Sequence, residues 1–384
     1  MTTQQIAEEY VRLALDIDQH LPGYIDAYFG PPEWKDEAAR AGKRPLVDLA
    51  HRAEILAGEV AADDNLDPQR KDFLSLHVRA MQTSLRLLGG EKLSLADEVE
   101  NIYDIRPQWI DESVFLERQR LLDDLLPRGG TLIERTAMRK RSVEIAVEKA
   151  KELLPILEAR LRQATRQRFP LPAEESVEFR FVSGKPWQGY NWYLGNCRSR
   201  IELNTDLPMQ LPRLVQLVAH ECYPGHHTEL CIKDTRLHHE KGELEHSLAL
   251  LNSPTCAISE GIATSAFSVI LSEQEQHDWY VQEIFPRAGL TAELGERETA
   301  INAALFPLGA AAGNAAFMLH DRGATDDEVL SYLRQYGLLT EAEARKRLEF
   351  IRDPLDRSYV FTYDMGRQLL MSLFALKGDT THWF

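Results

Sequence analysis

The chain has 384 residues, and its 44 Lys and Arg against 60 Asp and Glu give a formal charge of 44 − 60 = −16. This acidic balance disfavours nucleic-acid and anionic-membrane partners, because both attract clusters of positive charge. A hydrophobic fraction of 44% with 27% charged residues is typical of a folded globular protein. Residues 1–16 lack the basic start and apolar core of a signal peptide. We therefore expect a cytoplasmic protein that does not bind nucleic acid or a membrane.

The first half of the chain predicts helices, because apolar residues recur at intervals of three and four. Residues 6–17 carry one such stripe, and residues 74–88 carry another that ends at a glycine pair. Residues 131–168 contain no glycine and a single proline, Pro155. This stretch predicts one long helix with a kink near the proline.

The pattern changes to alternation after Pro172. Residues 177–182 and 200–203 alternate apolar and polar side chains, which predicts a small antiparallel sheet. Helical periodicity returns past Pro208 and continues nearly to the end. We expect a mainly α, multi-helix fold around a cleft, about two-thirds helical. Residues 1–170 would form an N-terminal helical lobe, and residues 171–384 a second lobe with the sheet and the candidate site, in one continuous fold.

The string His220-Glu221-Cys222-Tyr223-Pro224-Gly225-His226-His227 nearly spells H-E-x-x-H. In that motif two histidines four residues apart chelate zinc from one helix face, and the glutamate polarises a water molecule. Here the next histidines come six and seven residues after the first. On an unbroken helix neither would share a metal with the first, because one points about 120° away and the other lies about 10.5 Å along the axis.

Pro224 and Gly225 predict a disruption of this helix, because proline lacks an N–H and clashes with the preceding turn. Looping out two residues brings His226 to the position of the second ligand, and looping out three brings His227 there. We favour His226. Glu260 opens a later apolar helix and is the candidate third ligand, since a buried carboxylate there needs a charged partner. This set predicts one zinc ion.

At these residues the chain resembles the bacterial DUF885 family, whose members carry HE-x-YPGHH and a downstream E-G on a helix, and which resemble thermolysin-like zinc metallopeptidases. The likeness extends to residues 24–32, 200–205 and 363–367. The resemblance implies a mainly helical, cleft-containing metallopeptidase-like fold. Cys222 stands where members have Gly or Ala, and Ile262 stands in place of an aromatic residue, so the pocket departs from the family pattern.

Carried over residue by residue, the resemblance implies metal ligands at His220, His226 or His227, and Glu260. It places Glu221 as the general base that takes a proton from water.

Further residues are candidates for substrate contacts. Tyr363 is the candidate oxyanion donor, with His227 as the second candidate if it is not a ligand. Arg367, four residues later, would clamp a substrate carboxylate. The strand that ends at Asn204 would bind substrate backbone as an added strand. The pair at residues 238–239 is expected to be solvated.

These residues predict a zinc-dependent metallopeptidase that hydrolyses oligopeptides, with carboxypeptidase-like action as one form of this activity. We expect a small peptide as partner and a monomeric or homodimeric chain. One alternative is a metal-dependent amidase that acts on a non-peptide substrate. Another is a helical binding protein without catalysis, which would hold no stoichiometric metal.

Overall fold

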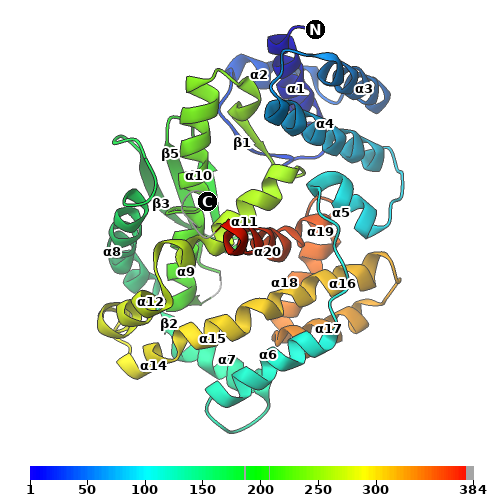
Figure 1. Ribbon diagram of the computed structural model, residues 1–384. Coiled ribbons are helices and arrows are strands. Elements are labelled where there is room, and N and C mark those ends of the chain that lie inside the picture. Colours follow the sequence, from blue (N-terminus) through cyan, green and yellow to red (C-terminus); the bar gives the residue numbers. More distant parts are fainter. Residues whose placement is uncertain (186, 207, 378–384) are drawn as a thin grey trace.

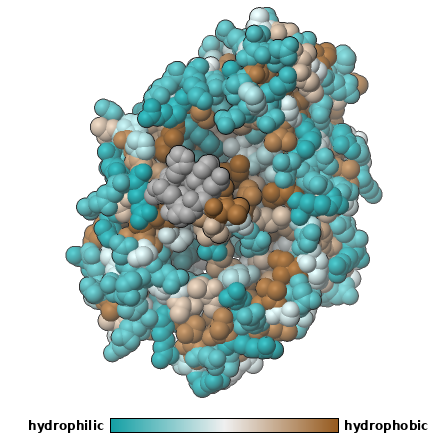
Figure 2. All heavy atoms as spheres, viewed as in Figure 1, coloured by the Kyte–Doolittle hydropathy of each residue, from teal (hydrophilic) through white to brown (hydrophobic). Residues whose placement is uncertain are grey.

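The computed structural model describes residues 1–185, 187–206 and 208–377. It is 67% helical with small sheets, which confirms the mainly α fold class. Figure 1 shows the N-terminal helices at one end, the longest sheet and α8 on one side, and the later helices at the other end. On the same face, Figure 2 shows mostly hydrophilic side chains, with hydrophobic ones gathered near the centre.

The N-terminal helices pack around their own hydrophobic cluster, which includes Tyr10, Leu49 and Leu74. A capping box at Thr2 starts the first helix. The elements are α1 (Thr3–Asp18), β1 (Ile25–Tyr28), α2 (Pro32–Ala41), α3 (Leu46–Ala62) and α4 (Pro68–Leu88).

The prediction of one helix over residues 131–168 is wrong. Two helices are separated by a short strand that pairs with β6. The Val143 carbonyl accepts a hydrogen bond from the Leu211 N–H, so a distant segment fixes the break, which local periodicity cannot report. Pro155 lies inside the second helix. The elements are α5 (Leu95–Tyr103), α6 (Glu112–Leu125), α7 (Leu132–Ser142), β2 (Glu144–Ile145) and α8 (Val147–Arg166).

The largest sheet has three strands in the order β3-β5-β4. The strands are β3 (Ser176–Val182), β4 (Gly189–Tyr193) and β5 (Arg198–Asn204), and β6 (Met209–Gln210) follows. The two predicted strands, β3 and β5, run parallel, which corrects the expected antiparallel pairing. The β4 strand, which the alternation did not predict, is antiparallel to β5, so the sheet is mixed. The edge strand β4 packs closely on α9 (Leu211–Glu221), where a Cβ on Gly189 would lie 2.7 Å from Leu217.

The elements that follow the sheet carry the candidate site and the second half of the fold. They are α10 (His226–Lys233), the π-helix η1 (Asp234–Glu240), η2 (Leu244–Ser247), β7 (Leu248–Leu250), α11 (Pro254–Ile270), α12 (Glu273–Trp279), η3 (Tyr280–Ile284), α13 (Phe285–Ala288), α14 (Ala292–Glu296), α15 (Glu298–Leu305), η4 (Phe306–Ala310), α16 (Ala311–His320), α17 (Asp326–Gly337), α18 (Glu341–Arg352), α19 (Asp356–Tyr359) and α20 (Thr362–Lys377). The β7 strand pairs with β1, which ties this half to the N-terminal helices.

Helix α11 belongs to two hydrophobic clusters at once. Ile262 and Ala266 pack in the cluster formed by α8, α9 and the sheet. Cys256 and Ala257, one turn earlier, pack in the cluster formed by α5, α6 and α15 to α18. Glu260 lies between these two pairs and is therefore placed at the junction of the clusters.

The stretch Glu298–His320 is long and apolar enough to cross a membrane by length and composition, with a hydropathy of 1.3 over its best window. Half of that window is buried inside the protein. Its residues Ile301, Ala304 and Leu308 pack in the second cluster. Core helices of soluble proteins meet the same criteria, so the stretch is weak support for a membrane span.

Helices α11 and α20 cross with their backbones in contact, at Gly261 and Gly366. A Cβ on Gly366 would lie 2.1 Å from the Ala257 carbonyl oxygen. We expect Gly366→Ala to lower the free energy of unfolding by about 1–3 kcal/mol, because the helices must separate. Urea unfolding measures this loss. Gly58→Ala is the matched control, since a Cβ there meets nothing within 4 Å in helix α3 and gains about 0.5–1 kcal/mol of helix propensity. Equal stability of both variants would contradict the prediction.

Candidate metal centre

The helix that carries the H-E pair ends at the predicted position. Helix α9 stops at Glu221, and α10 begins five residues later at His226. The intervening residues form a turn rather than a bulge in a continuous helix, so the predicted disruption is a complete break.

Gly225 explains how this turn folds back on α9. A Cβ at this position would lie 1.8 Å from the His220 carbonyl oxygen, which no side chain tolerates. The Gly225 N–H donates to the Ala219 carbonyl at 3.0 Å, and its own carbonyl accepts from Glu229 in α10. The close approach brings the start of α10 over the end of α9, and the His220 and His226 rings lie 4.8 Å apart at 90°.

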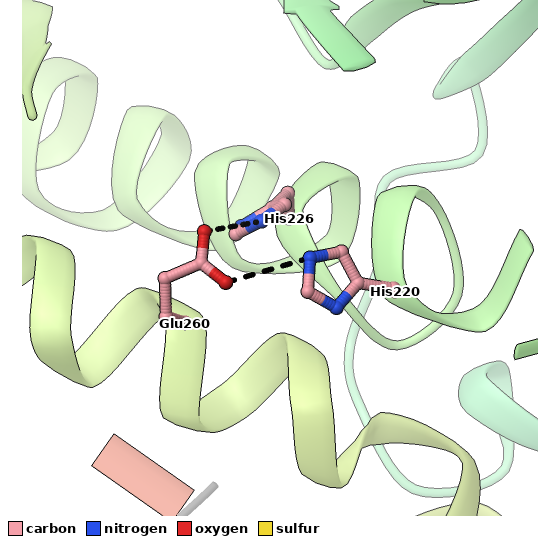
Figure 3. Close-up of side chains that lie close together, drawn as sticks. All are labelled: His220, His226 and Glu260. Atoms are coloured by element: carbon pink, nitrogen blue, oxygen red, sulfur yellow. Dashed lines mark ion pairs between the residues drawn. The ribbon is translucent and has the colours of Figure 1, made fainter. Parts of the chain in front are cut away.

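Three predicted ligands meet at this turn. Figure 3 shows His220 and His226 facing the carboxylate of Glu260, which projects from α11. His220 Nε2 lies 3.5 Å from Glu260 Oε2, and His226 Nε2 lies 3.5 Å from Glu260 Oε1. One atom from each residue lies within 4.8 Å of the others. Zinc bonds of about 2.0–2.2 Å in tetrahedral geometry separate neighbouring ligands by about 3.3–3.5 Å, so the spacing fits.

Hydrogen bonds orient the His226 ring. The Ser259 hydroxyl donates to Glu229, so His226 Nδ1 donates its proton to Ser259 Oγ at 3.0 Å. Lys233 in turn pairs with Glu229. When His226 is neutral, as a metal ligand must be, these hydrogen bonds place its proton on Nδ1 and leave the Nε2 lone pair toward the ligand position. Metal-ligating histidines are held by this kind of contact. Without an ion, Glu260 outweighs the effect of burial and raises the pKa of His226 to about 10.

Glu260 is buried, and one of its oxygens has no hydrogen-bond partner. The Tyr359 hydroxyl donates to Oε1, whereas Oε2 is buried without a partner among the described residues. Burial alone would raise the pKa of Glu260. Its contacts with His226, His220 and Tyr359 outweigh burial and hold this pKa below its usual value. Burial lowers the pKa of His220 to about 3, against the opposing effect of Glu260. An anionic oxygen thus faces a neutral imidazole, which is the donor set that a cation requires.

Glu221 lies beside this cluster but supplies none of its three ligand atoms. Its side chain is buried, and burial raises its pKa to about 7, helped by the charges of Glu260 and Asp26. The Asn191 side chain from β4 donates to the Glu221 carbonyl at 2.7 Å and so fixes the end of α9. A carboxylate with a pKa near neutrality is suited to accept and release a proton.

His227 does not join the cluster, which corrects its prediction as a donor or alternative ligand. It is fully buried, with Nδ1 2.8 Å from Ser199 Oγ and Nε2 3.2 Å from Glu175. Both ring nitrogens therefore have partners outside the cluster at Glu260. Glu175 also accepts from Tyr223 at 2.6 Å and from Arg162 at 2.7 Å. His227 is thus part of a buried network that supports the turn.

The Glu175 network predicts acid sensitivity of the fold. Although burial alone would raise the pKa of Glu175, hydrogen bonds from His227, Tyr223 and two arginines lower it from 4.5 to about 2. Because the folded pKa is depressed, this stabilisation is complete above about pH 4.5 and is lost as the pH falls toward 2. We expect Glu175→Gln to cost roughly 3 kcal/mol at pH 7 and less at pH 3. Urea unfolding at both pH values, with exposed Glu174→Gln as control, measures the difference. An equal loss at both values would contradict this prediction.

Tyr363 lies near the cluster, beside a second tyrosine, Tyr359, that sequence reasoning missed. The Tyr359 and Tyr363 rings meet edge to face at 5.4 Å, and Tyr359 reaches Glu260 directly. Burial raises the pKa of Tyr363 well above its usual value, so the phenol keeps its proton. The spacing of four residues was the available signal, because on the continuous helix predicted for this segment it places both rings on one face. In the structure Tyr359 ends α19 and Tyr363 lies in the first turn of α20.

The other predicted substrate contacts have different surroundings. Asn204 donates to the carbonyls of Lys185 and Trp187, so its amide holds the loop before β4. Its strand β5 is central and paired on both sides, which leaves β4 as the edge strand near the site and corrects the expectation of an added strand at β5. Arg367 lies over the Phe306 ring at 4.6 Å and forms no ion pair in the described part of the chain.

Two further arginines lie close enough to Tyr363 to interact with it electrostatically. Arg213 and Arg347 have no carboxylate partner within residues 1–185, 187–206 and 208–377, and Arg213 donates only to Gln188. Surrounding protein lowers the pKa of each guanidinium, while the Tyr363 hydroxyl opposes this effect on both. Arg213 also lines a cavity of about 170 Å³ beside α7 and α15, which none of the three clustered ligands lines.

No family model matches the chain, and no curated protein matches it. A crystal structure named BsuCP aligns with a TM-score of 0.51 and 11% identity, over 99% of this chain and 88% of that one. A carboxypeptidase of Pyrococcus furiosus aligns at 0.44 and 14%, over 100% and 88%. A protein of Colwellia psychrerythraea described as a putative lipoprotein aligns with a TM-score of 0.48 and 16% identity. The alignment covers 85% of this chain and 60% of the Colwellia protein. The BsuCP alignment shows a shared helical fold.

Proposed function

We propose that the chain is a zinc-dependent metallopeptidase of short peptides, related to the DUF885 family. The observation that carries this proposal is the buried Oε2 of Glu260, which faces His220 and has no hydrogen-bond partner in the part of the chain that the structure describes, with His226 on the other oxygen. Two imidazoles and one carboxylate are a common protein donor set of catalytic zinc sites. When bound, the ion supplies Lewis acidity toward the substrate carbonyl and acidifies water.

Residues of the chain would carry out the proton transfers, hold the ligands and stabilise the oxyanion. Glu221 accepts the proton of the attacking water and delivers it to the leaving amine, which its raised pKa permits at neutral pH. Tyr359 holds Glu260, and Ser259 holds His226 with Nε2 toward the ligand position. Tyr363 supplies a neutral hydroxyl that donates to the developing oxyanion.

The unpaired arginines support a substrate with a free carboxylate. Arg213, Arg347 and Arg367 lack carboxylate partners among the described residues; Arg347 and Arg367 are partly buried, which lowers the pKa of each, whereas Arg213 is exposed. A cation that is desolvated without a counter-ion gains most when a ligand brings the missing anion. We therefore assign carboxypeptidase-like specificity, with the C-terminus of the peptide toward these guanidinium groups.

Substitution of these arginines tests the assignment. We expect the wild-type protein to cleave free-acid peptides roughly 10- to 100-fold better in kcat/KM than their C-terminal amides, because a charged hydrogen bond contributes about 1.5–3 kcal/mol. Arg347→Gln or Arg213→Gln should abolish this preference. Arg345→Gln, on the same helix but paired with Glu341 at the surface, should keep it. Equal cleavage of acids and amides by the wild-type protein would contradict carboxypeptidase specificity.

A metal-dependent amidase is the second candidate, because the same cluster would serve any acyl substrate. A digest of a peptide library by zinc-loaded protein, read by mass spectrometry alongside the zinc content, separates the two. Zinc at the cluster with loss of C-terminal residues supports the peptidase. Zinc without cleavage of any peptide favours the amidase. A protein that binds no zinc when zinc is supplied in stoichiometric amount overturns both the peptidase and the amidase.

A further inference from the structure

A second group of metal-ligating side chains lies on η1, the π-helix that continues α10. Asp234, His238 and His239 each offer one ligand atom within 4.8 Å of the others. His238 Nδ1 and His239 Nε2 lie 3.1 and 3.2 Å from one oxygen, Asp234 Oδ1. These spacings approach the roughly 3.3 Å between neighbouring ligands of tetrahedral zinc. The two histidines were expected to be solvated, but His238 is only 17% exposed.

The π-helical winding explains how these three side chains meet. A π-helix bonds residue i to residue i+5, so side chains four and five positions later lie over the first. Asp234 opens the element, and the histidines occupy those two positions. Such turns are frequent at functional sites.

Asp234 is held as a metal-ligating carboxylate is usually held. It is fully buried, and its Oδ2 accepts from the Tyr193 hydroxyl and from the Asn196 N–H, both at 2.8 Å. Burial alone would raise the pKa of Asp234. His238 and these two donors outweigh burial and lower this pKa, so the Asp234 carboxylate is anionic. The fixed Oδ2 leaves Oδ1 facing the imidazoles.

Only one of the two histidines forms a hydrogen bond with Asp234. His238 Nδ1 is aligned as a donor to Oδ1. His239 Nε2 is equally near the same oxygen but makes only an ion-pair contact, without hydrogen-bond alignment. Two imidazole nitrogens converging on one carboxylate oxygen are what a shared cation would require.

We propose that Asp234, His238 and His239 bind a divalent transition-metal ion, separately from the cluster at Glu260. Two imidazoles and one carboxylate suit zinc, cobalt, nickel and copper rather than calcium or magnesium. The ion would fasten η1 to the β4–β5 turn through Tyr193 and Asn196. Because α10 runs directly into η1, the ion would also brace the helix that begins at His226.

Zinc stoichiometry tests this proposal on the full chain. After equilibration with zinc and removal of the excess, we expect two equivalents in the wild-type protein and one in His238→Asn/His239→Asn. His277→Asn is the matched control, because this surface histidine faces Asp278 at 3.2 Å and is in none of the candidate metal groups found among the described residues, so it should retain both equivalents. A single equivalent in the wild-type protein that persists in the His238→Asn/His239→Asn variant overturns the proposal.

A thermal measurement separates this site from the proposed catalytic site. In His220→Asn/His226→Asn, zinc should still raise Tm, because an ion that binds only the folded state stabilises it by mass action. The rise should vanish when His238→Asn and His239→Asn are added. A Tm of the first variant that does not respond to zinc overturns the second site, even if peptide cleavage by the wild-type protein is intact. Far-ultraviolet circular dichroism checks that each variant is folded.

Discussion

Glu221→Gln should lower kcat by about 10²- to 10⁴-fold, the usual contribution of a general base, and should leave zinc binding unchanged. The amide matches the carboxylate in shape but cannot accept a proton. None of the three clustered ligand atoms belongs to Glu221, so the metal content should remain that of the wild-type protein. Single-turnover cleavage of a peptide, with metal analysis of the same sample, measures both quantities.

Glu273→Gln is the matched control for this substitution, because Glu273 is exposed in the first turn of α12. It should retain full activity. A Glu221→Gln protein that retains both zinc and full kcat would remove Glu221 from the mechanism. Loss of zinc in this variant would instead make it a ligand and contradict the assignment of three ligands.

Glu260→Gln should abolish activity through the loss of the metal. The substitution removes the only negative charge among the three clustered ligands. Loss of a residue that merely supports a ligand typically lowers metal affinity about 10- to 100-fold, so here the zinc affinity should fall further. Tyr359→Phe removes such a supporting contact and should produce the smaller loss. Competition with a chromophoric chelator measures both affinities.

The same variant has a second readout that needs no substrate. Burial alone would lower the pKa of His226, but the hydrogen bond and charge of Glu260 raise it to about 10. Without the carboxylate we expect this pKa to fall, because burial remains and the largest opposing effect is lost, although Glu221 and Glu229 still raise it. NMR titration of the imidazole in metal-free protein reports the change. An unchanged pKa, or unchanged zinc affinity, would contradict the role given to Glu260.

The local features of the site followed from residue chemistry. Pro224 and Gly225 predicted the end of the helix, but this break left both His226 and His227 open as the second ligand, and the cluster contains His226. The structure adds the reason for the glycine, which is contact with the His220 carbonyl. The apolar periodicity of residues 258–271 predicted most of α11, which begins four residues earlier at Pro254, and a buried acid there predicted a charged partner.

Residues that act through long-range packing could not be predicted. Tyr359 reaches Glu260 across 99 positions, and Asn191 reaches the Glu221 carbonyl across 30. The division between α7 and α8 depends on pairing with β6, which lies more than 60 positions later. No periodicity in a window of 18 residues contains such information, because these contacts exist only once the chain is folded.

The position of α11 in two hydrophobic clusters gives a bound ion a mechanical role. His220 is anchored in one cluster through Val215 and Val218, and Glu260 sits where that cluster meets the next. An ion shared by these ligands would cross-link two separately packed regions. Removal of the ion by a chelator should therefore weaken the contact between the two clusters before either cluster unfolds. In hydrogen exchange, the amides of α11 and α20 should lose protection first.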